Sequence, residues 1–310
     1  MNTYSPTPPD EDQKRSGNSS VPFLSENEAE VARLLLLHRR LAELMGNVLL
    51  PLPDLSQMHR VLDVGCGVGA WAYEMAWRHP DMQVVGIDKS AFFIDQAQKH
   101  IFGNLSNVTY MVQDMQHLEG EMFAPGSFDL IHMRFMVGDV TMQGFPLLIR
   151  SLTQLCRPGG FFAWTEAEFP LTTSPAHERL CALVLHALQM VGRAFTPGNS
   201  LGITLCMSRW LRDSGYRVVQ DRAYGIEVSA GTKGHEMFAR QAYVFGNQVL
   251  PFLLETKATT ATEFEEVFTR MQKEVWDESF CGICYLRTMV GVRQPRSAPG
   301  PAPVSEQGAA

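Results

Sequence analysis

The chain has 310 residues, a formal net charge of −7 and hydrophobic residues over 45% of its length. This length and apolar content predict a sizeable core in one large domain or two small ones. The acidic balance argues against a nucleic-acid partner, because it predicts no surface that follows phosphates. Residues 1–20 lack the apolar stretch of a signal peptide, and the apolar runs are too short to cross a bilayer, so we expect a cytoplasmic protein without a membrane partner.

The N-terminal part of the chain is predicted to be a polar tail followed by a helical cap. Residues 1–22 are polar, and we expect a disordered tail there; residues 295–310 are rich in proline and give a matching C-terminal tail. Residues 23–56 form the cap. Ser25 is the expected N-cap, Glu28 completes a capping box, and the helix runs to about Leu50 before Pro51.

Residues 57–170 alternate between short apolar runs and amphipathic stretches. The expected strands are 60–64, 83–87, 108–112, 128–133 and 161–165, and the expected helices are 71–79, 90–100 and 145–156. A βαβα order of this kind predicts a Rossmann-like core, with a doubly wound, mostly parallel sheet.

Residues 171–294 are predicted to complete the same domain with lid helices and closing strands. We expect helices at 176–194, 200–214, 233–254 and 261–274, and strands at 216–228 and 280–292. The two closing strands bring the α/β sheet to seven strands. The two helices between them form an insertion that we expect to pack over the mouth of the site, together with the N-terminal helix.

The run 61–71 is the most informative pattern in the chain. It places Asp63 near the end of a buried strand, then a turn with Gly65, Gly67 and Gly69, then the start of a helix. Such a turn presents bare N–H groups and a helix N-terminus to a ligand, which suits phosphate. The carboxylate of Asp63 argues instead for a ligand with a cationic or hydroxyl group. S-adenosylmethionine (SAM) has an ammonium, a sulfonium and a ribose, and no phosphate.

Two further acidic residues follow strands two and three. Asp88 is placed to bind two ribose hydroxyls, because ligands of open α/β sheets lie at the carboxyl ends of the strands. Asp114 could accept from the adenine amine, with the N–H of Met115 facing a ring nitrogen.

A nicotinamide oxidoreductase is the alternative reading of the same turn. Gly65-x-Gly67-x-x-Ala70 with Asp88 also fits the dinucleotide-binding fingerprint. The negative carboxylate of Asp63 would be unfavourable beside a negative pyrophosphate, and Asp114 adds a third acidic residue near the adenine. The three carboxylates therefore favour SAM over NAD.

The segments 61–69, 86–90, 112–115, 128–131 and 155–160, in this order, resemble class I SAM-dependent methyltransferases over residues 57–168. A looser likeness to the LaeA-type methyltransferases of secondary metabolism rests on residues 131–134 and on Glu28, Glu30, Arg33, Leu34 and His38. The resemblance implies SAM as cofactor, bound by Asp63, Gly65, Gly67, Asp88, Asp114, Met115 and the backbone near Met133. Cys66, Gly69 and Lys89 lie in the same segments and complete the expected cofactor site.

The candidates for chemistry lie near the ends of strands four and five. Methyl transfer needs a general base only where the acceptor must lose a proton. His132 is the first candidate by position, although a packed histidine fits the strand pattern as well, and Glu166 is the second. Glu168 and Arg134 are candidates to bind the acceptor, and Phe135 is expected to line a largely apolar pocket.

We therefore predict a SAM-dependent methyltransferase acting on a small, hydrophobic metabolite of the natural-product type, with oxygen as the favoured acceptor atom. The alternative is a SAM-binding protein that transfers no methyl group, either a regulator or an enzyme that uses the sulfonium charge to promote a rearrangement or cyclisation. No metal is expected, because Cys281 and Cys284 lie in a predicted strand, face opposite sides of it, and have no second cysteine pair. The sequence does not predict the oligomeric state.

Overall fold

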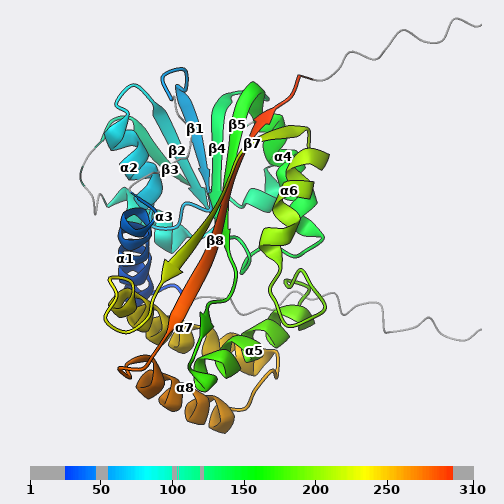
Figure 1. Cartoon of the computed structure of the whole chain (residues 1–310). Helices are drawn as coiled ribbons and strands as arrows, with labels where there is room; N and C mark the ends of the chain where they lie inside the picture. Colours follow the sequence, from blue (N-terminus) through cyan, green and yellow to red (C-terminus); the bar gives the residue numbers. More distant parts are fainter. Residues whose placement is uncertain (1–24, 47–54, 100–102, 104, 119–121, 296–310) are drawn as a thin grey trace, which may run out of the picture.

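A computed structural model describes residues 25–46, 55–99, 103, 105–118 and 122–295. The fold is centred on one eight-stranded sheet in the order β3-β2-β1-β4-β5-β8-β6, with β7 paired to β8 beside this path (Figure 1). The strands are β1 Arg60–Val64, β2 Gln83–Asp88, β3 Val108–Val112, β4 Phe128–Arg134, β5 Cys156–Ala167, β6 Leu171–Thr172, β7 Tyr216–Glu227 and β8 Gly282–Arg293.

The first five strands pair in parallel, and β8 runs antiparallel to β5, β6 and β7. This confirms the predicted doubly wound, mostly parallel sheet. The expectation of seven strands was wrong by one. Strand β6 pairs with Gly282 and Ile283, next to the part of β8 that pairs with β5, and two residues are too few to produce an alternating pattern.

Helices pack on both faces of the sheet and below the carboxyl ends of its parallel strands (Figure 1). They are α1 Glu28–Leu44, α2 Ala70–Arg78, α3 Ala91–Gln98, α4 Gly144–Leu155, α5 Pro175–Met190, α6 Ile203–Asp213, α7 His235–Glu255 and α8 Ala261–Val275. Helix α1 contacts both α2 and α7. The inserted helix α7 therefore meets the N-terminal helix.

Several helix ends differ from the prediction, and glycines account for most of the differences. The N-cap of α1 is Asn27, not Ser25, because its side chain accepts a hydrogen bond from the N–H of Glu30 at 2.9 Å. Helix α1 ends at Leu44, since Gly46 is left-handed with φ +86°. Gly192 and Gly202 are also left-handed; they follow the end of α5 and precede the start of α6. The predicted tails at 1–22 and 295–310 lie outside the described residues, apart from Pro295.

Strand alternation divides the buried side chains between two layers. Val61 of β1 and Leu130 of β4 pack with α2 on one face. Leu62 and Ile131, one residue further along, belong to the core on the other face. Asp63 and His132 therefore face the α2 side of the sheet, which explains how two polar residues in buried strands come to meet.

Candidate functional site

A cleft with a volume of about 180 Å³ lies where the carboxyl ends of β1, β2 and β4 meet helix α1. The glycine turn, the residues after β2 and the residues after β4 line it from the sheet. Leu34, Leu37, His38 and Leu41 line it from α1. Their spacing of three and four residues is that of one helix face, a signal in the sequence that would have identified them.

The glycine turn brings bare backbone to the cleft. Gly65, Gly67 and Gly69 have φ of +65°, +53° and +76°, in the left-handed region that favours glycine. A Cβ at Gly65 would lie 2.6 Å from the side chain of Met136, and one at Gly69 would lie 2.4 Å from the ring of Tyr110. Gly65, Cys66 and Gly67 line the cleft, whereas Gly69 lies outside its lining and packs against Tyr110.

Asp88 lies at the end of β2 and faces the cleft. Its Oδ2 accepts from the N–H of Gly67 and its Oδ1 from the N–H of Ser90, each at 2.9 Å. Burial raises the pKa of Asp88, and the two N–H groups oppose this rise. A carboxylate oxygen has two lone pairs, so each oxygen keeps one to accept a hydroxyl of a ribose. With the bare turn beside it, this carboxylate fits the SAM nucleoside.

The other expected cofactor residues are divided between the cleft and its surroundings. Lys89 lines the cleft and forms an ion pair with Asp139. Asp114 caps a short 3₁₀ helix by accepting from the N–H of Gln116, and it lies outside the cleft lining, as does Met115. The side chain of Met133 is fully buried in the core.

A smaller inner pocket, with a volume of about 40 Å³, adjoins the cleft. His38, Leu41, Arg134 and Phe135 line both spaces. Phe135 has φ +58°, which is costly for a residue other than glycine. Its N–H donates to the carbonyl of Thr165 at 3.1 Å, which holds it at the boundary between cleft and pocket.

Asp63 points to His132 and lies outside the cleft lining. Its Oδ1 lies 2.7 Å from Nδ1 of His132, whose ring stacks on Trp71 with centroids 3.5 Å apart. Asp63 and His132 are directly paired between β1 and β4. Burial lowers the pKa of His132, so the ring is neutral at neutral pH. The structure thus pairs Asp63, an expected cofactor residue, with His132, and it brings His132 into the lining of the inner pocket.

Arg134 is held at the junction of the two spaces by His38. Its Nη2 lies 3.0 Å from Nδ1 of His38, and Nε2 of His38 lies 2.7 Å from Oε2 of Glu74. Arginine only donates, so Nδ1 of His38 accepts and Nε2 donates to the carboxylate. Burial lowers the pKa of His38, in keeping with this neutral form. The guanidinium of Arg134 is therefore fixed in place.

The two glutamates after β5 have partners inside the fold. Oε1 of Glu166 accepts from Nε1 of Trp164 at 2.9 Å and from the N–H of Met136 at 3.0 Å. Burial raises the pKa of Glu166 to about 8. Glu168 accepts from the N–H groups of Gly202 and Thr204 at the start of α6. Neither glutamate lines the cleft or the inner pocket, so the structure does not bring them to the expected acceptor site.

The cysteines, and the lack of metal-binding clusters and membrane-spanning helices in the described ranges, add little to the site. All six cysteines are free, and burial raises the pKa of Cys66 well above its usual range, so its thiol stays protonated. Within the described ranges, no three His, Cys, Asp or Glu side chains are grouped in a way that could hold a metal ion. No helix in the same ranges combines the length and apolar character that a membrane span requires.

Comparisons with known proteins agree with this geometry. Residues 61–160 match a family model described as a methyltransferase domain. Methyltransferase str2 from Strobilurus tenacellus is 28% identical over 85% of this chain and 92% of its own length. Methyltransferase pytC from Aspergillus terreus is 25% identical over 83% of this chain and 74% of its own length.

The fold also matches a solved structure. A chain in the complex between the Trm112 methyltransferase activator and a methyltransferase of Haloferax volcanii aligns with a TM-score of 0.52 at 14% identity, covering 89% of this chain and 100% of that one. This structural match supports the fold, whereas the family model and the sequence relatives support the activity. Taken together with the cleft, the family match and the sequence relatives show a SAM-dependent methyltransferase, with a methyltransferase domain over residues 61–160.

Proposed function

We propose that this enzyme methylates a small, largely hydrophobic metabolite of the natural-product type, at an oxygen atom. The observation that carries the proposal is the inner pocket, which joins the cofactor cleft at Arg134 and Phe135. Trp71, Leu41 and Met45 give this pocket apolar walls, which suit an apolar group of an acceptor that extends from the cleft. A cytoplasmic location remains a prediction from the sequence.

In this proposal the cleft binds SAM, which supplies an electrophilic methyl group. The carboxylate of Asp88 accepts hydrogen bonds from the two ribose hydroxyls. The turn at Gly65 and Gly67 leaves room for the cofactor to lie close to the protein backbone. Asp114 and the N–H of Met115 remain our proposed adenine contacts. Helix α1 covers the cleft with Leu34, Leu37 and Leu41, which exclude water from the reacting groups.

The test is calorimetric titration of SAM into the wild type and the Asp88→Asn variant. Asparagine keeps the size of the side chain and loses the charge, so two charge-assisted hydrogen bonds weaken. We expect an affinity loss of roughly 10- to 100-fold. Asp81→Asn is the matched control, because Asp81 is an exposed carboxylate in the turn before β2.

Two results would contradict the proposal at different levels. Absence of binding at submillimolar SAM would contradict the cofactor site itself. Equal affinity of the wild type and Asp88→Asn would contradict the ribose assignment alone. Thermal unfolding of both variants shows whether the turn has survived the substitution. Release of S-adenosylhomocysteine in the presence of an acceptor separates methyl transfer from the alternative in which SAM is bound and not consumed.

A further inference from the structure

We propose that a groove between α1, α7 and α8 binds a small organic anion with an apolar, ring-containing body. The groove has a volume of about 750 Å³. Small-molecule sites measure about 300–1,000 Å³, so the groove has room for a ligand of that size. Among the described residues, none lines both this groove and the cofactor cleft or the inner pocket. The proposed site is therefore separate from the cofactor site and goes beyond the proposed function.

Small side chains leave the groove hollow. Ala29 and Ala32 lie about one turn apart on α1, and the buried Ala239 of α7 forms part of the floor. Helices that pack closely fill the space between them with longer side chains, so three alanines at one junction leave a cavity. Leu34 and Leu37 line the cofactor cleft from other positions of α1. Helix α1 thus presents one face to the cleft and another to the groove.

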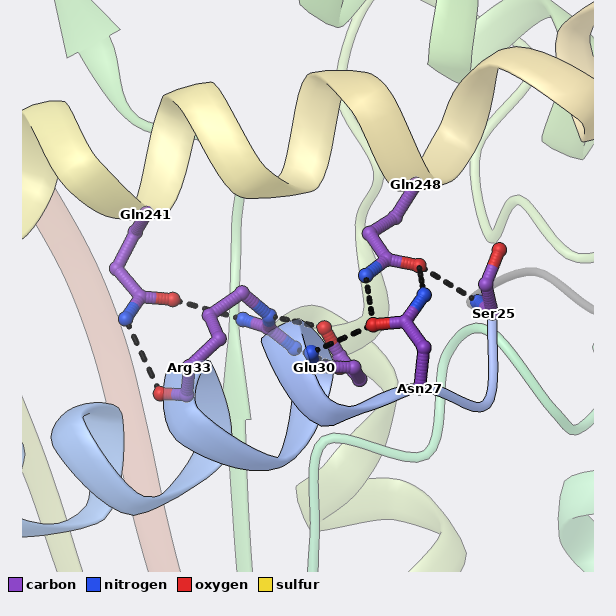
Figure 2. A network of polar contacts seen from close by, with 6 residues as sticks. All are labelled: Ser25, Asn27, Glu30, Arg33, Gln241 and Gln248. Carbon is purple, nitrogen blue, oxygen red and sulfur yellow. Dashed lines mark hydrogen bonds and ion pairs between the residues drawn. The ribbon is translucent and has the colours of Figure 1, made fainter.

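The wall of the groove at Arg33 is fixed. Nε of Arg33 donates to Oε2 of Glu30 at 2.6 Å, and Nη1 donates to Oε1 of Gln241 at 2.8 Å (Figure 2). Glu30 is fully buried and lines the cleft, whereas Arg33 lines the groove. This ion pair therefore stands between the two spaces. A wall that is already ordered lowers the entropy cost of binding a ligand.

The charges at the groove favour an anion. The described residues that line it include three cations, Arg33, Arg240 and Lys273, and no Asp or Glu, although the chain has a net charge of −7. Glu30 neutralises Arg33, and Glu236 pairs with Arg240 at 2.9 Å. Lys273 is exposed and has no ion-pair partner in the described part of the chain. Its ammonium is therefore the charge that remains available for a carboxylate or a sulfonate.

Two exposed aromatic rings give the groove its apolar character. Tyr243 of α7 is 50% exposed, Trp276 just after α8 is 53% exposed, and both line the groove. The ring of Tyr243 stacks on Phe268, and that of Trp276 meets His235 edge to face, so neighbouring rings hold both in place. Aromatic side chains exposed beside a hollow offer a large apolar contact area to a ligand. The ligand is therefore expected to combine a ring system with one negative group.

The first test uses two fluorescent probes that share one ring system. 8-Anilinonaphthalene-1-sulfonate is negative, and N-phenyl-1-naphthylamine lacks the sulfonate and is neutral. We expect the wild type to bind one molecule of the anionic probe per chain, more weakly as the salt concentration rises. Lys273→Gln should weaken binding of the anionic probe roughly two- to fivefold and leave the neutral probe unchanged. Arg209→Gln is the control, because it removes an exposed cation of α6 that lies outside the groove.

The second test fills the groove. In Ala32→Trp the indole would occupy the hollow, so both probes should bind roughly tenfold more weakly or worse. Ala261→Trp is the matched control, because Ala261 is an exposed alanine at the start of α8 outside the groove lining. Thermal unfolding checks that both variants fold. If Ala32→Trp does not fold, Lys273→Gln decides, since it changes only an exposed side chain.

Three results would overturn the proposal. If S-adenosylhomocysteine displaced the anionic probe, the probe would lie in the cofactor cleft. If Lys273→Gln and Arg209→Gln had the same effect on the anionic probe, the groove would not select the anion. If sedimentation showed a wild-type dimer that Ala32→Trp converts to a monomer, the groove would be an interface for a second copy of the chain. Each result leaves SAM binding, and with it the proposed function, intact.

Discussion

A left-handed backbone is costly for any residue with a Cβ, and two non-glycine residues of the described chain adopt it, Phe135 and Lys257. Phe135 lies at the boundary of the cleft and the inner pocket, where a strained residue serves the site. Lys257 lies just after α7 and is exposed. Its N–H donates to the carbonyl of Leu254, and the next N–H donates to that of Leu253, which is the Schellman pattern. Its conformation therefore serves the helix end alone.

Lys257→Gly is expected to stabilise the protein by about 0.5–1 kcal/mol, because glycine adopts the left-handed conformation of the Schellman motif without strain. Urea unfolding measures the difference. Lys233→Gly is the matched control: Lys233 is an exposed turn residue outside the left-handed region, so glycine there should give no gain. Equal effects at the two positions would show that the strain at Lys257 costs nothing.

Single residues also show where sequence reasoning stops. The turn glycines and Asp88 were predicted from local patterns, and the structure places Gly65, Gly67 and Asp88 in the cleft. Asp63 was predicted to face the cofactor, yet its partner is His132, 69 positions away. Only the pairing of β1 with β4 brings these two side chains together. A local pattern contains no information on that pairing.

At the scale of elements, α1 is fastened to α7 by a network of side chains (Figure 2). The N–H of Ser25 donates to Oε1 of Gln248 at 3.0 Å, and Nε2 of Gln248 donates to Oδ1 of Asn27 at 3.2 Å. One turn further along α1, Arg33 pairs with the buried Glu30 and donates to Oε1 of Gln241 at 2.8 Å. The helix that covers the cleft is thus held by the inserted helix.

Gln248→Ala should loosen the first turn of α1, because it removes the contacts to Ser25 and to the capping residue Asn27. We expect faster amide hydrogen exchange in that turn and severalfold weaker SAM binding. Asn247→Ala is the matched control, since Asn247 is exposed and bonds only to its own helix, at Tyr243. Exchange rates that stay at the wild-type level in Gln248→Ala would contradict the role of this contact in holding α1.

The elements themselves were predictable to different degrees. The bounds of β1 and β3 match their predictions, because short runs of apolar and β-branched residues between turn signals mark both strands. The ends of α1, α5 and α6 were missed, although Gly46, Gly192 and Gly202 stand beside them in the sequence. A glycine ends a helix only where the chain turns left-handed, and tertiary packing decides that.

At the scale of the whole molecule, buried ionisable groups couple stability to pH. Burial raises the pKa of Glu166 from 4.5 to about 8 and lowers that of His177 from 6.5 to about 4. Between pH 4.5 and about 8, the folded protein binds the Glu166 proton more tightly than the unfolded chain does. Glu166 therefore lowers the free energy of unfolding as the pH rises through this range. His177 acts in the opposite sense, because only the unfolded chain binds its proton between pH 4 and 6.5. The two slopes offset each other below pH 6.5.

Above about pH 6.5 the unfolded chain no longer protonates His177, and the slope from Glu166 remains. The free energy of unfolding of the wild type should therefore fall relative to that of Glu166→Gln by about 1.4 kcal/mol between pH 6.5 and 7.5. Glutamine keeps an oxygen to accept from Trp164 and Met136, and Asp88, whose pKa is also raised, is common to both proteins and cancels in the difference. Urea titrations at both pH values measure the difference. Glu278→Gln, at an exposed position, is the control, and its free energy of unfolding should change with pH as that of the wild type does. The same pH dependence in the wild type and Glu166→Gln would contradict the prediction, because it would mean that Glu166 is ionised throughout this range.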